Sequence, residues 1–139
     1  MKVQPYLFFD GRCDEALAFY KRTLGAEPGM LVRFKDNPDG PKPDGLPPGS
    51  GDKVMHAEMR IGETVVMLSD GHCGGKPVFQ GMSLSLTVDG DDDADRIFAA
   101  LAEGGRVQMP IGKTFFASRF GIVADRFGVS WMVGTTPTG

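Results

Sequence analysis

The feature that most constrains the fold is that one order of secondary-structure signals occurs twice along the chain. In each half, the hydrophobic pattern predicts a strand, a helix and then three more strands. The two predicted helices, 14–24 and 91–103, align when Ala16 is placed on Ala94. The chain of 139 residues is therefore interpreted as an internal duplication. Neither half alone could bury both faces of its sheet.

These elements predict a single α+β domain made of two tandem βαβββ modules, one at about residues 1–75 and the other at about 76–139. Together the modules would form one curved eight-stranded mixed sheet, with the helices on its outer face and a concave cup on its inner face. Glycine and proline are frequent in residues 36–52, which favours a mobile surface loop. The predicted strands are 3–9, 30–35, 54–61, 64–69, 82–88, 107–111, 114–123 and 129–133.

Composition limits the classes of partner. The formal net charge is -3 at pH 7, which argues against a nucleic-acid partner. No apolar run approaches the roughly 20 residues that a membrane-spanning helix needs, and the first residues lack the layout of a signal peptide. The 2 cysteines are too few for a disulfide framework. We therefore expect a cytoplasmic protein that contacts neither nucleic acid nor membrane.

Three segments resemble the vicinal oxygen chelate superfamily, which includes glyoxalase I, bleomycin-resistance proteins and extradiol dioxygenases. They are residues 4–9 (QPYLFF), residues 15–26 around the helix motif EALAFY, and residues 125–131 (DRFGVSW). Residues 54–62 (VMHAEMRIG) are most similar to the PhnB-like branch. The resemblance implies the duplicated fold and a homodimer, but a shared fold says little about the reaction.

Enzymes of this superfamily usually hold one divalent metal ion in the cup, with ligands from the first and last strands of each half. The resemblance places these positions at Gln4 (or its neighbour Pro5), Met67, Ser83 and Met132. Such ions prefer imidazole and carboxylate ligands, which methionine and serine do not supply. We therefore predict no metal at the usual site, no cofactor and no glyoxalase I activity. PhnB-like proteins are often labelled methyltransferases, but no Rossmann-type glycine-rich loop follows a strand here.

His56 and Glu58 are the candidate catalytic residues. They lie two positions apart on a predicted strand, so their side chains point to the same face. If that face lines the cup, His56 could act as a base or hydrogen-bond donor, with Glu58 orienting it or acting as an acid. The alternatives are a solvent-exposed edge or a cross-strand pair with a residue such as Arg60.

The predicted cup wall is apolar with a few hydroxyl groups, a mixture typical of small-molecule pockets. The alternative is that bulky side chains fill the cup. Residues 70–75 bring Asp70, His72 and Cys73 together between glycines, which fits either a reactive site or a linker. Trp131 lies on the strand face opposite Met132 and is expected to pack beneath a helix. The candidate ligand-binding residues are Gln4, Tyr6, Phe8, Met67, Ser69, Ser83, Ser85 and Met132.

Three functions remain open from the sequence. The first is a module that binds a small-molecule ligand in a cup without the usual metal. The second is an enzyme that uses His56 and Glu58, with or without a metal at non-standard positions. The third is a structural or interaction protein whose cup is filled.

Overall fold

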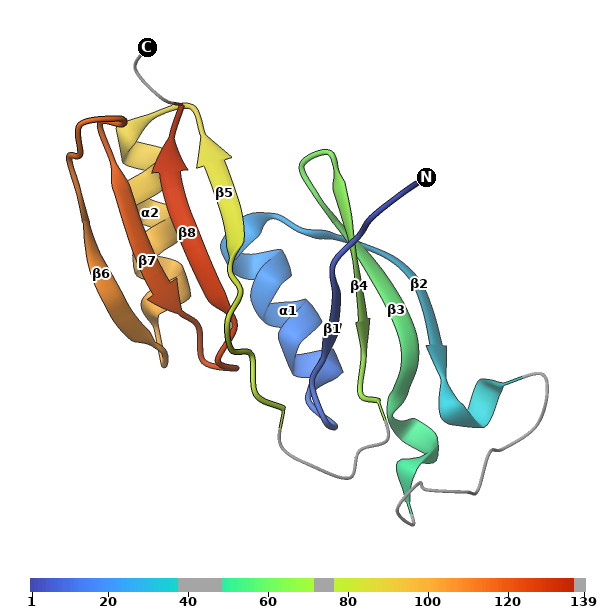
Figure 1. Cartoon of the computed structure of the whole chain (residues 1–139). Helices are drawn as coiled ribbons and strands as arrows, with labels where there is room; N and C mark the ends of the chain where they lie inside the picture. The colour runs from blue at the N-terminus through green and yellow to red at the C-terminus, as the bar shows by residue number, and fades with distance from the viewer. Residues whose placement is uncertain (38–48, 72–76, 137–139) are drawn as a thin grey trace. The chain divides into compact units, whose positions relative to one another are not determined.

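The computed structural model describes residues 1–37, 49–71 and 77–136. The chain divides into two compact units, Met1–Pro77 and Val78–Gly139. Within the described residues, each unit contains one α-helix and one four-stranded sheet (Figure 1).

The first unit has its strands in the order β1-β4-β3-β2. The first strand pairs parallel with β4, while β4 pairs antiparallel with β3 and β3 with β2. Its elements are β1 (Tyr6–Phe8), α1 (Cys13–Leu24), β2 (Glu27–Arg33), β3 (Val54–Ile61) and β4 (Thr64–Ser69), with two short 3-10 helices, η1 (Phe34–Asp36) and η2 (Ser50–Asp52).

The second unit repeats this topology in the order β5-β8-β7-β6, again with one parallel pair, β5 with β8. Its elements are β5 (Leu84–Val88), α2 (Asp91–Ala102), β6 (Arg106–Gly112), β7 (Phe120–Ala124) and β8 (Ser130–Thr135). The predicted α+β class and tandem βαβββ modules are confirmed. The described strands are hydrogen-bonded as two sheets of four rather than as one sheet of eight.

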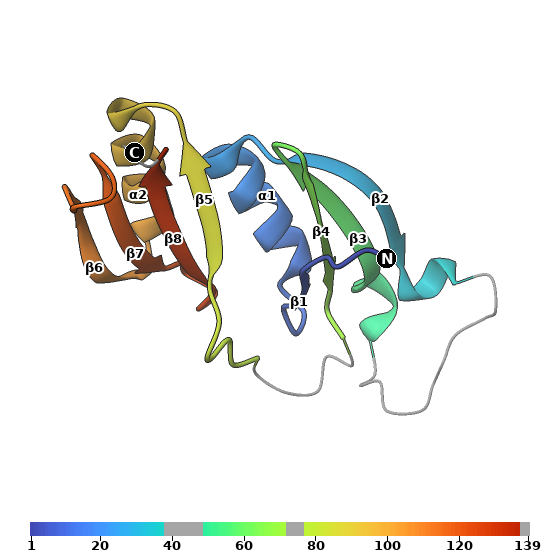
Figure 2. The same ribbon diagram turned by 45° about the horizontal axis from the view of Figure 1, so that its top comes forward.

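Each helix packs against one face of its own sheet (Figure 2). In the first unit, apolar residues at helical spacing in α1, such as Ala16 and Tyr20, are buried on the same side as Leu7 and Leu68. In the second unit, α2 contacts β7 and β8, and Trp131 is 1% exposed on that side, as expected. One helix covers only one face of a sheet, so the other face of each sheet carries partly exposed side chains.

Several element bounds differ from the prediction for local reasons. β1 begins at Tyr6, because Pro5 has no backbone N–H to donate to a ladder. β2 extends back to Glu27 along the edge of its sheet, where a proline in the strand is tolerated. The predicted strand 114–123 begins only at Phe120, because Thr114 and Ala117 form a hydrogen-bonded turn. The predicted loop 36–52 begins at η1 and ends at η2, and its residues 38–48 lie outside the described residues.

Candidate functional site

The face of the first sheet that points away from α1 gathers most of the candidate residues from the first half of the sequence. Tyr6 pairs with Met67 across β1 and β4, and Met67 pairs with Glu58 across β4 and β3. The alternating neighbours on these strands are buried on the α1 side, so Phe8 and His56 also lie on this face. We call these five residues the open face.

A chain of two hydrogen bonds crosses the open face. The Tyr6 hydroxyl lies 2.7 Å from His56 Nδ1, and His56 Nε2 lies 3.2 Å from Glu58 Oε2. A carboxylate accepts hydrogen bonds but cannot donate them, so Nε2 carries the hydrogen toward Glu58. In a neutral imidazole, Nδ1 is then the acceptor, and the Tyr6 hydroxyl donates to it. Glu58 thereby holds the imidazole in one tautomer and one orientation.

Two aromatic rings of β1 form an apolar surface beside this chain. Tyr6 and Phe8 are stacked with ring centroids 4.9 Å apart and planes 10° from parallel. Their exposed fractions are 38% and 48%, so both rings remain accessible. Partial burial raises the pKa of Tyr6, and the nearby Ser69 hydroxyl lowers it by less. The phenol is therefore protonated at neutral pH.

The remaining first-half residues of the predicted cup wall are less available. Gln4 is half-buried, and its Nε2 donates to the carbonyl of Val65 at 3.4 Å. Ser69 is buried, and its hydroxyl donates to the carbonyl of Met55 at 2.7 Å and accepts from the N–H of Gly71 at 2.9 Å. The hydroxyl of Ser69 is therefore already hydrogen-bonded to the local backbone.

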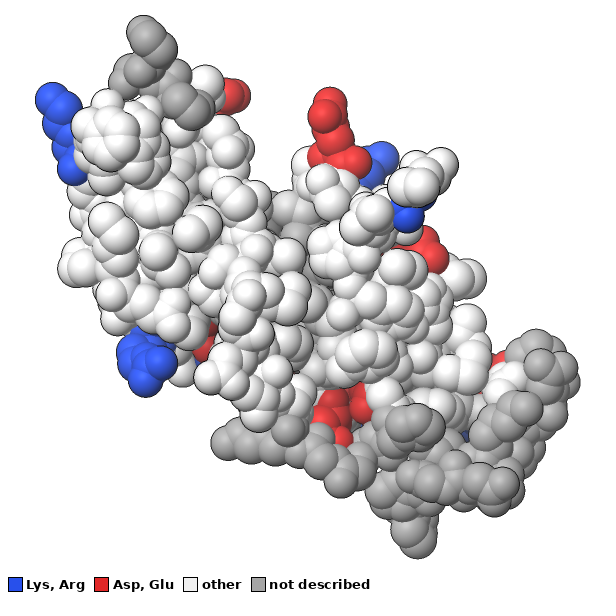
Figure 3. Space-filling model, in the orientation of Figure 1, with Lys and Arg blue, Asp and Glu red and all other residues white. Residues whose placement is uncertain are grey.

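In the second unit, the candidates lie on the face of the sheet that points away from α2. Ser83 Oγ is 2.7 Å from Ser130 Oγ, and Ser130 donates to Gln108 Oε1 at 3.3 Å. Ser85 is exposed and pairs with half-buried Met132 across β5 and β8. In Figure 3 this face is drawn almost entirely white, with charged side chains at its margins. A single cup lined by both units stays a prediction.

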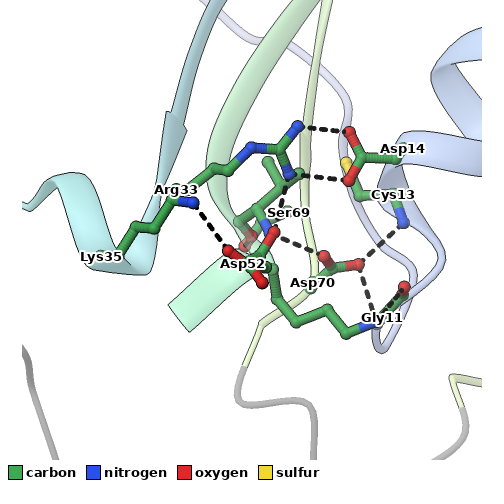
Figure 4. Close-up of polar contacts among 10 residues, drawn as sticks. Gly11, Cys13, Asp14, Arg33, Lys35, Asp52, Ser69 and Asp70 are labelled. Carbon is green, nitrogen blue, oxygen red and sulfur yellow. Dashed lines mark hydrogen bonds and ion pairs between the residues drawn. The ribbon is translucent and has the colours of Figure 1, made fainter. Parts of the chain in front are cut away.

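Asp70, from the cluster at residues 70–75, has a structural role. It is 2% exposed and follows β4 directly. Its Oδ1 accepts from the N–H groups of Gly11 and Cys13, and its Oδ2 accepts from that of Val54, each at 2.8 Å (Figure 4). The carboxylate thus ties the start of α1 to the start of β3. His72 and Cys73 lie outside the described residues.

Cys13 is fully buried at the start of α1. A helix N-terminus on its own lowers the pKa of a thiol, but here burial and then the Asp70 and Asp14 carboxylates raise it. The thiol is therefore neither exposed nor activated as a nucleophile. Beside it, Arg33 donates hydrogen bonds from its two Nη atoms to the two carboxylate oxygens of Asp14, at 2.8 Å and 2.9 Å, and this pairing lowers the pKa of Asp14 (Figure 4).

The family model for the glyoxalase/bleomycin resistance protein/dioxygenase superfamily matches residues 2–133. The chain belongs to this superfamily. The YjdN protein of Escherichia coli strain K12 is 36% identical over 138 residues, covering 96% of this chain and 94% of YjdN.

Two solved structures extend the comparison within the superfamily. Protein PA1353 from Pseudomonas aeruginosa is 42% identical, with a TM-score of 0.84 and 98% of each chain covered. The PhnB protein from Bacillus cereus is 28% identical, with a TM-score of 0.81, and the match covers 98% of this chain and 100% of that one. The resemblance to PhnB-like proteins is thereby confirmed. A membrane-spanning helix would need more length and apolarity than either α1 or α2 has among the described residues.

The residues at the four positions that the resemblance assigns to the usual metal site do not fit a divalent metal ion. Gln4 offers only an amide, Ser83 an alcohol, and Met67 and Met132 thioethers, so imidazole and carboxylate are both missing from the donor set. Moreover, Gln4 and Ser83 are already hydrogen-bonded to neighbouring groups. Within the described ranges, no three His, Cys, Asp or Glu side chains are grouped so that they could hold a metal ion.

The sequence predicts that Tyr6 and His56 could line the same cup, but it does not predict the hydrogen bond between them. They lie on strands β1 and β3, which are both neighbours of β4 rather than of each other. Alternation along one strand indicates which residues share a face, but it does not give the order of strands. It also did not reveal the role of Asp70, because an Asp-Gly pair in a glycine-rich segment is typical of an ordinary turn.

Proposed function

We propose that the protein binds a small molecule on the open face of the first sheet, without the usual divalent metal of the superfamily. The observation that carries this proposal is the exposed Tyr6–Phe8 ring stack beside the Tyr6–His56–Glu58 hydrogen-bond chain. Small-molecule sites combine apolar and aromatic walls with a few oriented polar groups, which is the composition of this face.

The tautomer argument supports a binding role for the polar groups. Because Glu58 accepts from His56 and His56 accepts from Tyr6, all three side chains are oriented before any ligand arrives. Side chains that are already oriented lose little conformational entropy when a ligand binds, so less of the binding free energy is offset by ordering them. The accessible rings of Tyr6 and Phe8 supply the apolar contact.

The test is a titration with indole, a planar and uncharged aromatic probe, followed by amide NMR. We expect saturable shifts at residues of β1 and β3. Phe8→Leu should weaken binding because it removes an aromatic ring that is 48% exposed. Phe115→Leu is the matched control, since Phe115 is 97% exposed but belongs to the second unit. Shifts confined to the second unit, or equal affinity in Phe8→Leu and wild type, would refute the site.

A second function, acid–base catalysis on the same face, is favoured by one observation. His56 lies between a hydroxyl at 2.7 Å and a carboxylate at 3.2 Å, the arrangement in which a base is oriented by a third group. His56 would accept a proton through Tyr6, and Glu58 would stabilise the resulting imidazolium. If a substrate screen finds turnover, Glu58→Gln should lower kcat, because the imidazolium then has no carboxylate beside it. Turnover that is unchanged in Glu58→Gln would exclude this role.

We also propose that the protein is a homodimer. Each sheet has an edge strand with exposed apolar side chains, Met30 and Leu31 on β2 and Val107 and Met109 on β6. Exposed edges of this kind favour association with another chain. The second copy is the partner that the superfamily resemblance implies.

A further inference from the structure

We infer that the ligand of the open face is an uncharged planar molecule that donates a hydrogen bond, through an O–H or N–H group, to the hydroxyl oxygen of Tyr6. This inference rests on the proposed function and adds the chemical class of the ligand. It follows from the direction in which hydrogens are donated along the chain Tyr6–His56–Glu58.

The direction of this chain is set at its far end by a charge. Glu58, as a carboxylate, has no hydrogen to give, so a neutral His56 donates to it from Nε2 and accepts at Nδ1. The single hydrogen of the Tyr6 hydroxyl is then used in the 2.7 Å bond to His56. The hydroxyl oxygen keeps accepting capacity and has no hydrogen left for a ligand. Its hydrogen-bonding role toward a ligand is therefore that of an acceptor.

The neighbouring hydroxyl does not fill that role. Ser69 is close enough to influence the pKa of Tyr6, but it gives its own hydrogen to the carbonyl of Met55 at 2.7 Å. A hydroxyl has one hydrogen, so Ser69 does not donate to Tyr6 at the same time. The Tyr6 oxygen is therefore left to accept from a bound molecule or from solvent.

The charges around the chain disfavour an anionic ligand. The Glu58 carboxylate lies on the open face itself, with its side chain 36% exposed. The next outward-facing residue of β3 is a cation, Arg60, but it is ion-paired with Glu27 across β2 and β3. A carboxylate or phosphate ligand would meet repulsion from Glu58 and an acceptor, Tyr6, that cannot donate to it.

The shape of the apolar surface favours a planar ligand body. The Tyr6 and Phe8 rings are within 10° of parallel, and both are accessible. Because these two rings are stacked on each other, a flat aromatic or conjugated molecule extends the stack at an outer ring face or lies along the ring edges, and directs an O–H or N–H group to the Tyr6 hydroxyl. Phenols, enols and indole-type N–H compounds belong to this class.

The test compares two probes with the same planar ring system, indole and N-methylindole, which differ by one methyl group on the nitrogen. Both are planar and uncharged, but only indole can donate a hydrogen bond. Isothermal titration in slightly alkaline buffer should give wild-type affinity about fivefold to tenfold higher for indole, the ratio expected for one net hydrogen bond. In Tyr6→Phe this ratio should fall to about one, because the acceptor is gone. In Phe8→Leu both affinities should fall and the ratio should persist.

Each outcome separates the inference from the proposal on which it depends. If both probes bind equally well to wild type and both weaken in Phe8→Leu, the site exists but the inference is wrong. Tighter binding of N-methylindole than of indole would also overturn it. If neither probe binds, or if neither variant changes the affinity, the proposed function itself fails. The wild-type ratio does not depend on whether Tyr6→Phe folds, and circular dichroism checks that variant.

Discussion

Replacing Asp70 by Asn tests whether one buried carboxylate holds the first unit together. The side chain accepts three backbone hydrogen bonds of 2.8 Å, from Gly11, Cys13 and Val54. The residue that precedes α1 provides no side-chain cap of its own, so Asp70 takes that role from the end of β4. Asn has nearly the same shape, and the substitution therefore isolates the second oxygen and the negative charge.

The magnitude follows from the geometry of the amide. Its one oxygen can still accept from Gly11 and Cys13, but its NH₂ group then faces the N–H of Val54, and two donors meet. Loss of this hydrogen bond to a charged group costs about 1.5–3 kcal/mol. Removing the negative charge from the N-terminus of α1 adds about 0.3–1 kcal/mol. We expect Asp70→Asn to lower the free energy of unfolding by roughly 2–4 kcal/mol. Asp70→Ala should cost more, because all three N–H groups lose their acceptor.

Urea unfolding followed by far-UV circular dichroism measures this loss. The chain has one tryptophan, Trp131, which lies in the second unit, so its fluorescence reports on that unit separately. Asp89→Asn is the matched control, since Asp89 is exposed. The reasoning would be refuted if Asp70→Asn stayed within about 0.5 kcal/mol of wild type, the range of ordinary surface substitutions. It would also fail if Asp70→Ala were no worse than Asp70→Asn.

Four further predictions concern packing, charge, metal and assembly. Trp131→Ala should cost about 3–5 kcal/mol, because the ring is buried and its Nε1 donates to Asp125; a loss below about 1 kcal/mol in urea unfolding would contradict this. Arg33→Gln should lower the free energy of unfolding by about 0.5 kcal/mol at neutral pH, since Asp14 is exposed and Arg33 is half-buried. The pKa of Asp14 is lowered on folding, so this contribution is complete above its ordinary value of 3.8 and is lost as the pH falls through the lowered value. A wild-type advantage over Arg33→Gln that persists in stronger acid would be inconsistent with that. Dialysed protein should contain far less than one equivalent of zinc, nickel, iron or manganese by mass spectrometry, and a stoichiometric amount would contradict the loss of the usual site. Sedimentation at micromolar concentration should give a homodimer, and a monomer would count against it.

The elements that sequence predicted best are those whose ends are determined by local backbone chemistry. The hairpin strands β3 and β4 have the predicted bounds, because Gly62 adopts the left-handed conformation that the turn between them requires. Helix α1 ends before Gly25, which has φ 66° and donates its N–H to the carbonyl of Lys21, as a helix stop should. The strand predicted at residues 114–119 is wrong because a local side-chain hydrogen bond overrides the strand preference. Its aromatic residues favour a strand, but the Thr114 side chain accepts the N–H of Ala117 and forms a turn instead.

The candidate site was predictable as a face but not as a network. Alternation places His56 and Glu58 on one side of β3, and the structure brings them to 3.2 Å. The Tyr6 contact depends on the strand order β1-β4-β3, which alternation does not contain. The same holds for Asp70, whose three donors lie 16 to 59 residues away in sequence. Hydrogen bonds between residues so far apart in sequence depend on the tertiary structure, and local sequence patterns do not predict them.

The two modules share a topology but end their surface hydrogen-bond chains differently. In the second unit the chain runs from Ser83 through Ser130 to the amide of Gln108. An amide group both donates and accepts, so this chain can reverse direction when Gln108 rotates. In the first unit the last group is the Glu58 carboxylate, which only accepts, and the direction of donation is fixed. The two modules therefore share a fold but not a surface hydrogen-bond pattern, because the last residue of each chain, Gln108 or Glu58, determines whether the direction of donation can reverse.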